Sequence, residues 1–212
     1  MSAEIFKLHK INPEIRKVKK IVEALKDGAV ILYPTDTGFT LGCQLANKNA
    51  IEQLRRIRGI TTKKALTFLC KDLSNISTFA TVSNLAYKTI KSLIPGPYTF
   101  ILPATKQVPK LAQHPTRKTA GIRVPDSVVV STLLEIMEEP IISITAKLPS
   151  FEDDFLTPEE TIDQFIKLVD IVVCMEEYNF LGESTVIDMI TNDFTIMRKG
   201  AGYENVSYLE DI

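Results

Sequence analysis

The chain has 212 residues, of which 45% are hydrophobic and 24% are charged, and its formal net charge is −1. This length and composition predict one ordinary globular domain over residues 1–212 and exclude a low-complexity or fibrous chain. Residues 1–10 carry scattered charges, and no apolar run is long enough to cross a bilayer, so we expect a cytoplasmic protein without a membrane partner. The three cysteines are far apart and the two histidines are distant, which predicts reduced core thiols and argues against a zinc site.

Short apolar runs predict the strands. Runs of four to six apolar residues bounded by turn or polar residues are typical of buried strands. In chain order, the predicted strands cover residues 29–33, 39–43, 66–70, 98–102, 120–124 and 141–145, and three further apolar runs cover residues 171–174, 185–189 and 194–197.

Capping residues predict the helices. The first predicted helix starts at Asn12, Pro13 and Glu14, and Gly28 is placed to end it. A second helix begins at Asn47 and ends at Gly59, and we expect its arginines to point away from the core: Arg55, Arg56 and Arg58. The predicted helices cover residues 13–27, 47–58, 83–94 and 128–137, and a fifth begins at residues 157–160. About seven strands with four or five interspersed helices predict an α/β fold, a mixed open sheet flanked by helices.

Charge is distributed unevenly along the chain. Residues 55–123 hold thirteen basic side chains and one acidic one, whereas residues 124–212 hold four basic and nineteen acidic ones. One outcome is a positive face or cleft, and the other is a surface on which the two segments pair. The sequence leaves both open.

Residues 33–42 form a hydroxyl-rich stretch, Tyr-Pro-Thr-Asp-Thr-Gly-Phe-Thr-Leu-Gly, directly after the first predicted strand. Such a stretch is either a polar turn or part of a ligand site, because open α/β sheets bind ligands at strand ends. Further polar groups fall at predicted strand ends: Arg58 with Lys63 and Lys64, Arg123, residues 145–147, and Ser184 and Thr185 with Arg198. Guanidinium groups and hydroxyls that converge predict a site for a phosphate or a carboxylate.

Other catalytic patterns are missing from the sequence. There is no glycine-rich dinucleotide or P-loop motif, no Ser-His-Asp set, no cysteine with a nearby histidine and no carboxylate cluster typical of a metal-dependent hydrolase. Chemistry here would therefore depend on positioning and electrostatics, as it does in nucleotidyl or phosphoryl transfer.

Four ordered motifs resemble those of the YrdC-like domain family. Pro-Thr-Asp-Thr-Gly-Phe-Thr-Leu-Gly at residues 34–42 is similar to its Pro-Thr-acidic-Thr-x-Tyr-Gly-Leu-Gly signature. Residues 95–102 resemble its Pro-Gly-Pro-x-Thr-x-Ile-Leu segment, residues 121–125 its Val-Arg-x-Pro stretch and residues 184–188 its Ser-Thr-Val-x-Asp stretch. The resemblance covers about residues 13–202, nearly the whole chain.

The resemblance implies a twisted mixed sheet with a concave, positively charged surface that binds ATP with magnesium. In the catalytic branch it implies that threonine, bicarbonate and ATP give L-threonylcarbamoyl-AMP and pyrophosphate, for modification of adenosine in tRNA. By the matched positions, Thr35 and Thr37 would hold threonine, Arg123 a phosphate or carboxylate, and Ser184 and Arg198 the nucleotide. Arg58 would take the place of the lysine in the family's Lys-x-Arg element.

Two signatures depart from the synthase pattern. Arg58-Gly59-Ile60 replaces Lys-x-Arg, and Thr145-Ala146-Lys147 replaces Ser-x-Asn, a pattern nearer the YciO-like subgroup. Lys63 or Lys147 could replace the missing arginine contact, so we expect Lys63, Thr145 and Lys147 to join the nucleotide site. Two functions follow: an adenylate-forming enzyme, or a non-catalytic protein that binds double-stranded or other structured RNA, tRNA or the ribosome through the same basic surface.

Overall fold

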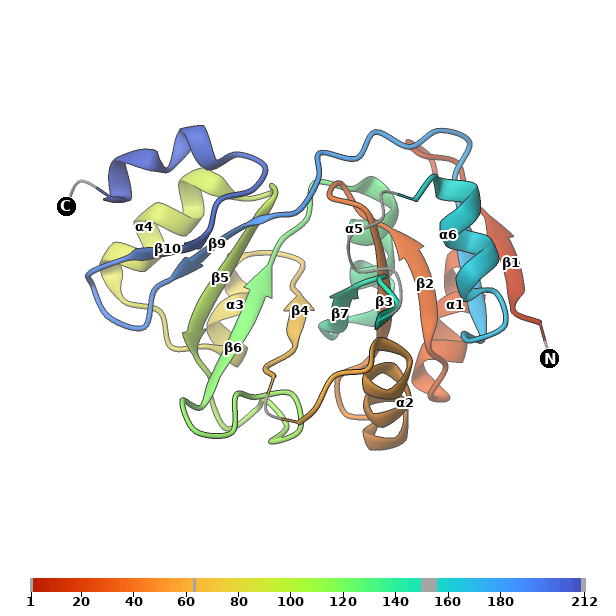
Figure 1. The fold of residues 1–212 in the computed structure, drawn as a ribbon, viewed down its shortest axis with the longest axis horizontal. Coiled ribbons are helices and arrows are strands. Elements are labelled where there is room, and N and C mark those ends of the chain that lie inside the picture. Colours follow the sequence, from red (N-terminus) through yellow and green to blue (C-terminus); the bar gives the residue numbers. More distant parts are fainter. Residues whose placement is uncertain (1, 63, 150–155, 211–212) are drawn as a thin grey trace.

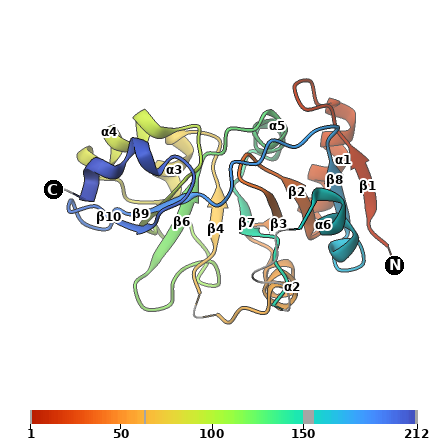
Figure 2. The same cartoon turned by 45° about the horizontal axis from the view of Figure 1, so that its top comes forward.

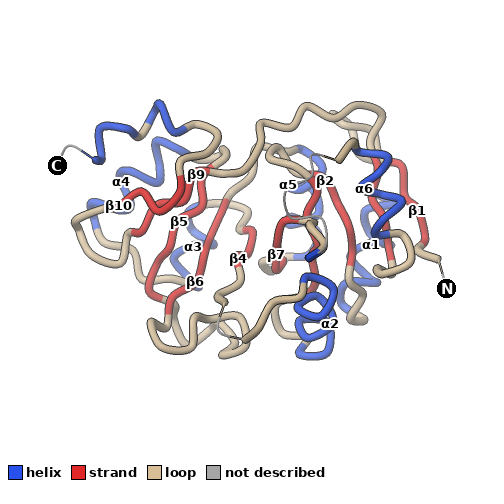
Figure 3. The backbone as a smooth tube through the Cα atoms, viewed as in Figure 1, coloured by secondary structure: helices blue, strands red, loops and turns tan. Residues whose placement is uncertain are grey.

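The computed structural model describes residues 2–62, 64–149 and 156–210, which form a mixed sheet flanked by helices (Figures 1, 2 and 3). The strands are β1 (Glu4–Lys7), β2 (Ile31–Pro34), β3 (Phe39–Gln44), β4 (Thr67–Leu69), β5 (Tyr98–Pro103), β6 (Thr119–Arg123), β7 (Ile141–Thr145), β8 (Ile171–Cys174), β9 (Thr185–Asp188) and β10 (Thr195–Arg198). The helices are α1 (Ile15–Lys26), α2 (Lys48–Arg58), α3 (Leu73–Phe79), α4 (Asn84–Leu93), α5 (Val128–Met137), α6 (Pro158–Phe165) and the 3-10 turns η2 (Tyr203–Asn205) and η3 (Ser207–Glu210).

All the described strands belong to one sheet of ten strands, in the order β1-β8-β2-β3-β7-β4-β6-β5-β9-β10. Four neighbouring pairs are parallel (β1–β8, β2–β8, β4–β6 and β5–β9) and the other pairs are antiparallel. The predicted mixed sheet is confirmed, but the predicted count of about seven strands is wrong. β1 was missed because only Phe6 of its four residues is buried, so its sequence lacks an apolar run.

The predicted helix ends are confirmed where capping chemistry is strong. Asn47 accepts a hydrogen bond from the Ala50 amide, and Gly59 ends α2 in the left-handed conformation with a φ of 64°. Gly28 ends α1, and the Ala29 amide donates to the Ala24 carbonyl, as in a Schellman motif.

Two details of the predicted helices are wrong. Helix α1 begins at Ile15 with Glu14 as its N-cap, so Asn12 and Pro13 precede it. Helix α3 was not predicted, because its seven residues include two serines, an asparagine and a threonine and only Ile76 is buried.

The apolar residues form two clusters. One packs α1 and α5, the two helices behind the sheet in Figure 1, against β1, β2 and β8. The other runs along the central strands and includes residues of α2, α3, α4 and α6. Cys43 and Cys70 are buried, Cys174 is half-buried, and all three are free thiols, as predicted. No helix among the described residues is long and apolar enough to cross a membrane.

Small residues face one another across the centre of the sheet. Ser143 of β7 lies opposite Thr67 of β4, and Thr67 lies opposite Gly121 of β6. A Cβ atom added at Gly121 would lie 2.7 Å from Thr67 Oγ1, so this row has little room for larger side chains. Among the described helices, none lies in front of β4, β5 and β6 in Figure 1. The sheet therefore offers an uncovered floor lined by hydroxyls.

Candidate functional site

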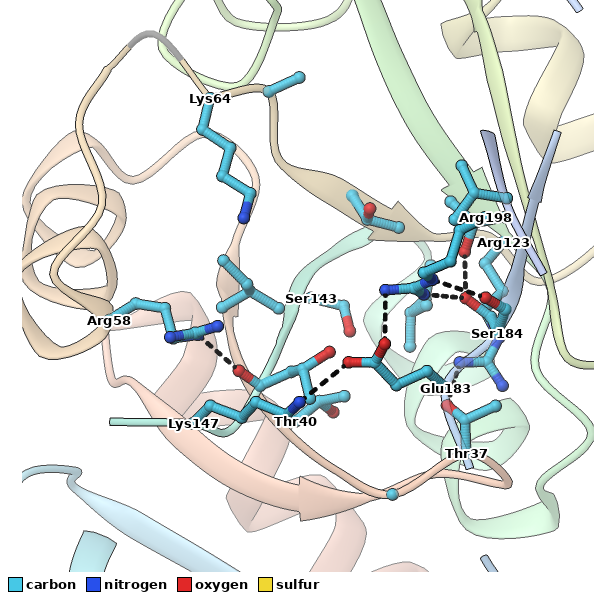
Figure 4. A pocket seen from close by; sticks show the side chains of 18 of the residues that line it. Thr37, Thr40, Arg58, Lys64, Arg123, Ser143, Lys147, Glu183, Ser184 and Arg198 are labelled. Atoms are coloured by element: carbon cyan, nitrogen blue, oxygen red, sulfur yellow. Dashed lines mark hydrogen bonds and ion pairs between the residues drawn. The ribbon is translucent and has the colours of Figure 1, made fainter. Parts of the chain in front are cut away.

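A cavity of about 380 Å³ lies over this floor, between the C-terminal end of α2 and strands β5, β9 and β10 (Figure 4). Five cations and one carboxylate line it: Arg58, Lys64, Arg123, Lys147, Arg198 and Glu183. Its hydroxyls come from Thr37, Thr40, Thr67, Thr99, Ser143, Thr145 and Ser184. The cavity is therefore polar and net positive, which suits an anionic ligand.

The structure brings together seven of the nine predicted site residues at this cavity: Thr37, Arg58, Arg123, Thr145, Lys147, Ser184 and Arg198. Thr35 does not line it. Its hydroxyl donates to the Gly38 carbonyl at 2.9 Å and lies 3.2 Å from the Thr37 hydroxyl, so it shapes the turn from inside. Lys63, the other predicted site residue, lies outside the described residues.

Arg123 is the most enclosed of these cations, with 5% of its surface exposed. Its guanidinium forms an ion pair with the Asp36 carboxylate and also donates to the Thr37 hydroxyl and the Gly96 carbonyl. Burial lowers the pKa of Arg123, and the charge of Asp36 opposes that shift. Arg123 therefore joins the turn after β2 to the sheet, and Asp36 balances much of its charge.

The arginines of α2 correct one prediction. Arg55 and Arg58 were expected to point away from the core, but they are only 5% and 8% exposed. Arg55 donates to the carbonyls of Thr61, Lys64 and Leu111, and so joins the loop after α2 to the loop between β5 and β6. Arg58 Nε donates to the Thr145 carbonyl at 2.9 Å, which places its guanidinium at the cavity.

Arg198 and Lys147 reach the cavity from two separate elements (Figure 4). Arg198 of β10 donates to the carbonyl and the hydroxyl of Ser184, both at 3.0 Å, and the Ser184 hydroxyl lies 2.9 Å from that of Thr99. Between Arg198 and Lys147 lies Glu183, whose carboxylate is 3.1 Å from a nitrogen of each. Burial raises the pKa of Glu183, but the bond from Lys147 and the charges of Arg198, Lys147 and Arg58 outweigh it and lower the pKa.

Sequence reasoning missed Glu183 and most of the hydroxyls of the floor. The hydroxyls do have a signal, because Thr40 and Ser143 are polar residues inside β3 and β7, where they and their apolar neighbours are buried at consecutive positions. Glu183 has none, since a single glutamate between Gly182 and Ser184 is normally a solvated surface residue. Among the described residues, no group of three or more His, Cys, Asp or Glu side chains could hold a metal ion.

The uneven charge distribution along the chain produces both expected arrangements, a positive cavity and a surface on which basic and acidic segments pair. Arg58, Lys64 and Arg123 of the basic segment line the cavity. Other basic side chains of that segment pair with the acidic half of the chain, Lys71 with Glu135 and Arg117 with Asp188, both at 3.2 Å. The concave, positive surface that the resemblance implied corresponds to this cavity.

Comparisons with known proteins agree with this architecture. The model of the Sua5/YciO/YrdC family, described as "Telomere recombination", matches residues 23–200. The "uncharacterized protein YciO" of Escherichia coli is 39% identical over 202 residues, which are 94% of this chain and 97% of that protein. A threonylcarbamoyl-AMP synthase of Vibrio vulnificus is 29% identical over 162 residues, which are 75% of this chain and 86% of that protein.

Solved structures show the same fold. The crystal structure of Escherichia coli YciO matches with a TM-score of 0.86 at 39% identity and covers 94% of this chain and 97% of that one. The structure of P. abyssi Sua5 complexed with L-threonine matches with a TM-score of 0.85 at 22% identity and covers 97% of this chain and 60% of that one. The resemblance stated from the motifs is confirmed, and the chain belongs to the Sua5/YciO/YrdC family.

Proposed function

We propose that this chain is an adenylate-forming enzyme that makes L-threonylcarbamoyl-AMP and pyrophosphate from threonine, bicarbonate and ATP with magnesium. The observation that carries the proposal is the cavity itself, where Arg58, Lys64, Lys147 and Arg198 surround a hydroxyl-lined floor. Such a site suits a phosphate chain and a carboxylate together, because arginine and lysine bind both and hydroxyls satisfy the remaining lone pairs. The name of the Vibrio vulnificus relative supports this choice of reaction.

The residues divide into ligand-binding and positioning groups. Arg198, Lys147 and Ser184 are suited to the phosphates, together with Thr145 and the predicted Lys63. Arg58 is suited to the carboxylate of threonine, and Thr37, which lies across the cavity beside Arg123, is suited to its hydroxyl. Thr35 and Arg123 are positioning residues, because their polar groups bond within the turn and to Asp36.

In this reaction, the amine of threonine attacks bicarbonate and releases water, and an oxygen of the resulting carbamate attacks the α-phosphorus of ATP. Pyrophosphate leaves. The cations would stabilise the charge that grows on the leaving group, and magnesium would arrive as part of the nucleotide substrate.

The test is pyrophosphate release with threonine, bicarbonate and magnesium-ATP. We expect release to require threonine and bicarbonate, and Arg198→Ala to lower it about tenfold to a hundredfold, since a hydrogen bond to a charged group contributes about 1.5–3 kcal/mol. Arg16→Ala is the matched control, because Arg16 is an exposed arginine of α1. Release that does not depend on threonine would exclude this reaction.

RNA binding is the second candidate, and one observation favours it. Lys106, Lys110 and Lys118 are exposed on the loop that Arg55 joins to the loop of Lys64. If this surface binds structured RNA or tRNA, a gel shift should weaken steeply with salt, and replacing the three lysines by alanine should reduce the salt dependence. A shift with RNA and no binding of ATP would favour this candidate over the enzyme.

A further inference from the structure

A carboxylate already occupies part of the proposed phosphate site. Glu183 Oε1 lies 3.1 Å from Lys147 Nζ, and Glu183 Oε2 lies 3.1 Å from Arg198 Nη1. Figure 4 shows this carboxylate between the two cations, on the side of the cavity opposite Arg58 and Lys64. Glu183 therefore makes with Lys147 and Arg198 the contacts that a phosphate would make.

The backbone on both sides of Glu183 is anchored. The Leu181 amide donates to the Asp36 carbonyl at 2.8 Å, and the Ala201 amide donates to the Glu183 carbonyl at 2.8 Å. Gly182 between these anchors has a φ of 88°, a conformation that glycine adopts at little cost. The anchored backbone keeps the glutamate at the site whether or not a ligand is present.

The side chain of Glu183 is less restricted than its backbone. It is 44% exposed, and its two ion-pair partners, Lys147 and Arg198, are 36% and 40% exposed. Such pairs are partly solvated and contribute little to stability, so a ligand can displace the carboxylate by a rotation of the side chain. The displaced carboxylate remains close to the bound anion and repels it.

We propose that Glu183 is a specificity-determining residue that competes with polyphosphates for Lys147 and Arg198 and so weakens their binding to the cavity. This inference rests on the proposed function, because it assumes that the phosphates of the nucleotide bind to these two cations. Glu183 thereby makes the cavity selective. An anionic ligand forms ion pairs with Lys147 and Arg198 only if it displaces Glu183, whereas the affinity of a neutral ligand is unaffected.

The experiment compares the binding of inorganic pyrophosphate to the wild-type chain and to Glu183→Gln by titration calorimetry, with a chelator present so that no metal ion can bridge the carboxylate and the phosphate. Glutamine keeps the size of the side chain and removes its charge. We expect Glu183→Gln to bind pyrophosphate about tenfold more tightly, which corresponds to about 1.4 kcal/mol. The binding of adenosine, which carries no charge, should stay within about twofold of wild type.

The matched control is Glu176→Gln. Glu176 is an exposed glutamate that pairs with Lys7, and its replacement changes the net charge by the same amount. Pyrophosphate affinity should stay at the wild-type level in this variant, so a gain in both variants would show a general charge effect and overturn the proposal.

Two other outcomes separate this inference from the proposed function. Equal or weaker binding of pyrophosphate to Glu183→Gln overturns the inference and leaves threonine-dependent pyrophosphate release as an independent test of the enzyme. A tenfold gain together with no threonine-dependent release supports the inference and overturns the proposed reaction. Failure of both proteins to bind pyrophosphate overturns the inference, and threonine-dependent release still decides the proposed reaction.

Discussion

Two arginine–carboxylate pairs lie at the same cavity, and they differ mainly in burial. In the Arg123–Asp36 pair, each side chain is 6% exposed. In the Arg198–Glu183 pair, the side chains are 40% and 44% exposed. Both pairs join a guanidinium group to a carboxylate, so the difference in solvent access determines how much each pair contributes to the stability of the fold.

Burial makes the first pair structural. A buried charge that loses its partner has neither water nor an opposite charge, whereas an exposed charge recovers water when its partner leaves. Arg123 also bonds to Thr37 and Gly96, and so fixes the turn that follows β2. Arg198 and Glu183 can separate at little cost, which leaves that side of the cavity available for exchange with a ligand.

The largest expected effect comes from breaking the buried pair. Arg123→Ala should lower the free energy of unfolding by about 3–5 kcal/mol, because the Asp36 carboxylate would remain buried without its partner. Arg198→Ala should lower it by no more than about 1 kcal/mol. Urea unfolding followed by circular dichroism measures both values.

A double variant supplies the control for this comparison. Removing both buried charges with Asp36→Asn and Arg123→Met should recover part of the loss, because no uncompensated charge remains. Similar losses in Arg123→Ala and Arg198→Ala would show that burial does not distinguish the two pairs.

The second prediction concerns Ser184, which anchors the exposed pair to the sheet. Ser184 is 6% exposed, and its hydroxyl bonds to that of Thr99 and accepts from Arg198. Ser184→Ala should lower the free energy of unfolding by about 1–2 kcal/mol, since the Thr99 hydroxyl loses a buried partner. The measurement is again urea unfolding.

Ser77→Ala is the control for that variant. Ser77 is an exposed serine of α3 whose hydroxyl donates to the Leu73 carbonyl, so its loss should cost under about 0.5 kcal/mol. If Ser184→Ala is as mild as this control, the Ser184 hydroxyl does not anchor the exposed pair.

The sequence predicted the elements whose signals are local. Asn47 and Gly59 delimit α2 as expected, and residues 141–145 and 171–174 form the predicted strands β7 and β8, because caps and buried apolar runs act through neighbours in the chain. β1 has no such signal. β1 pairs in parallel with β8, which is far from it in the sequence, so the formation of β1 depends on the assembled sheet.

The residues of the site also differ in whether their placement depends on local sequence signals or on the assembled fold. Thr37, Arg123 and Ser184, each near the end of a strand, line one cavity, because an open sheet brings its strand ends together. The burial of Arg55 could not be predicted, since the three carbonyls that accept its hydrogen bonds belong to two loops whose paths only the fold determines. Glu183 was missed for the same reason, because both of its partners come from other strands or loops.

The smallest expected effect concerns Glu183, the carboxylate of the exposed Arg198–Glu183 pair. Lys147 and Arg198 hold the pKa of Glu183 below its usual value near 4.5, although burial alone would raise it. Because the folded value is the lower one, the stabilising contribution is complete above about pH 4.5 and disappears as the pH falls through the lowered value. The wild-type chain should therefore be more stable than Glu183→Gln at pH 7, by under about 1 kcal/mol, and the difference should vanish in acid. Urea unfolding of both proteins between pH 7 and pH 3 measures this, and a difference that persists or grows in acid would mean that Glu183 is not held charged by its two partners.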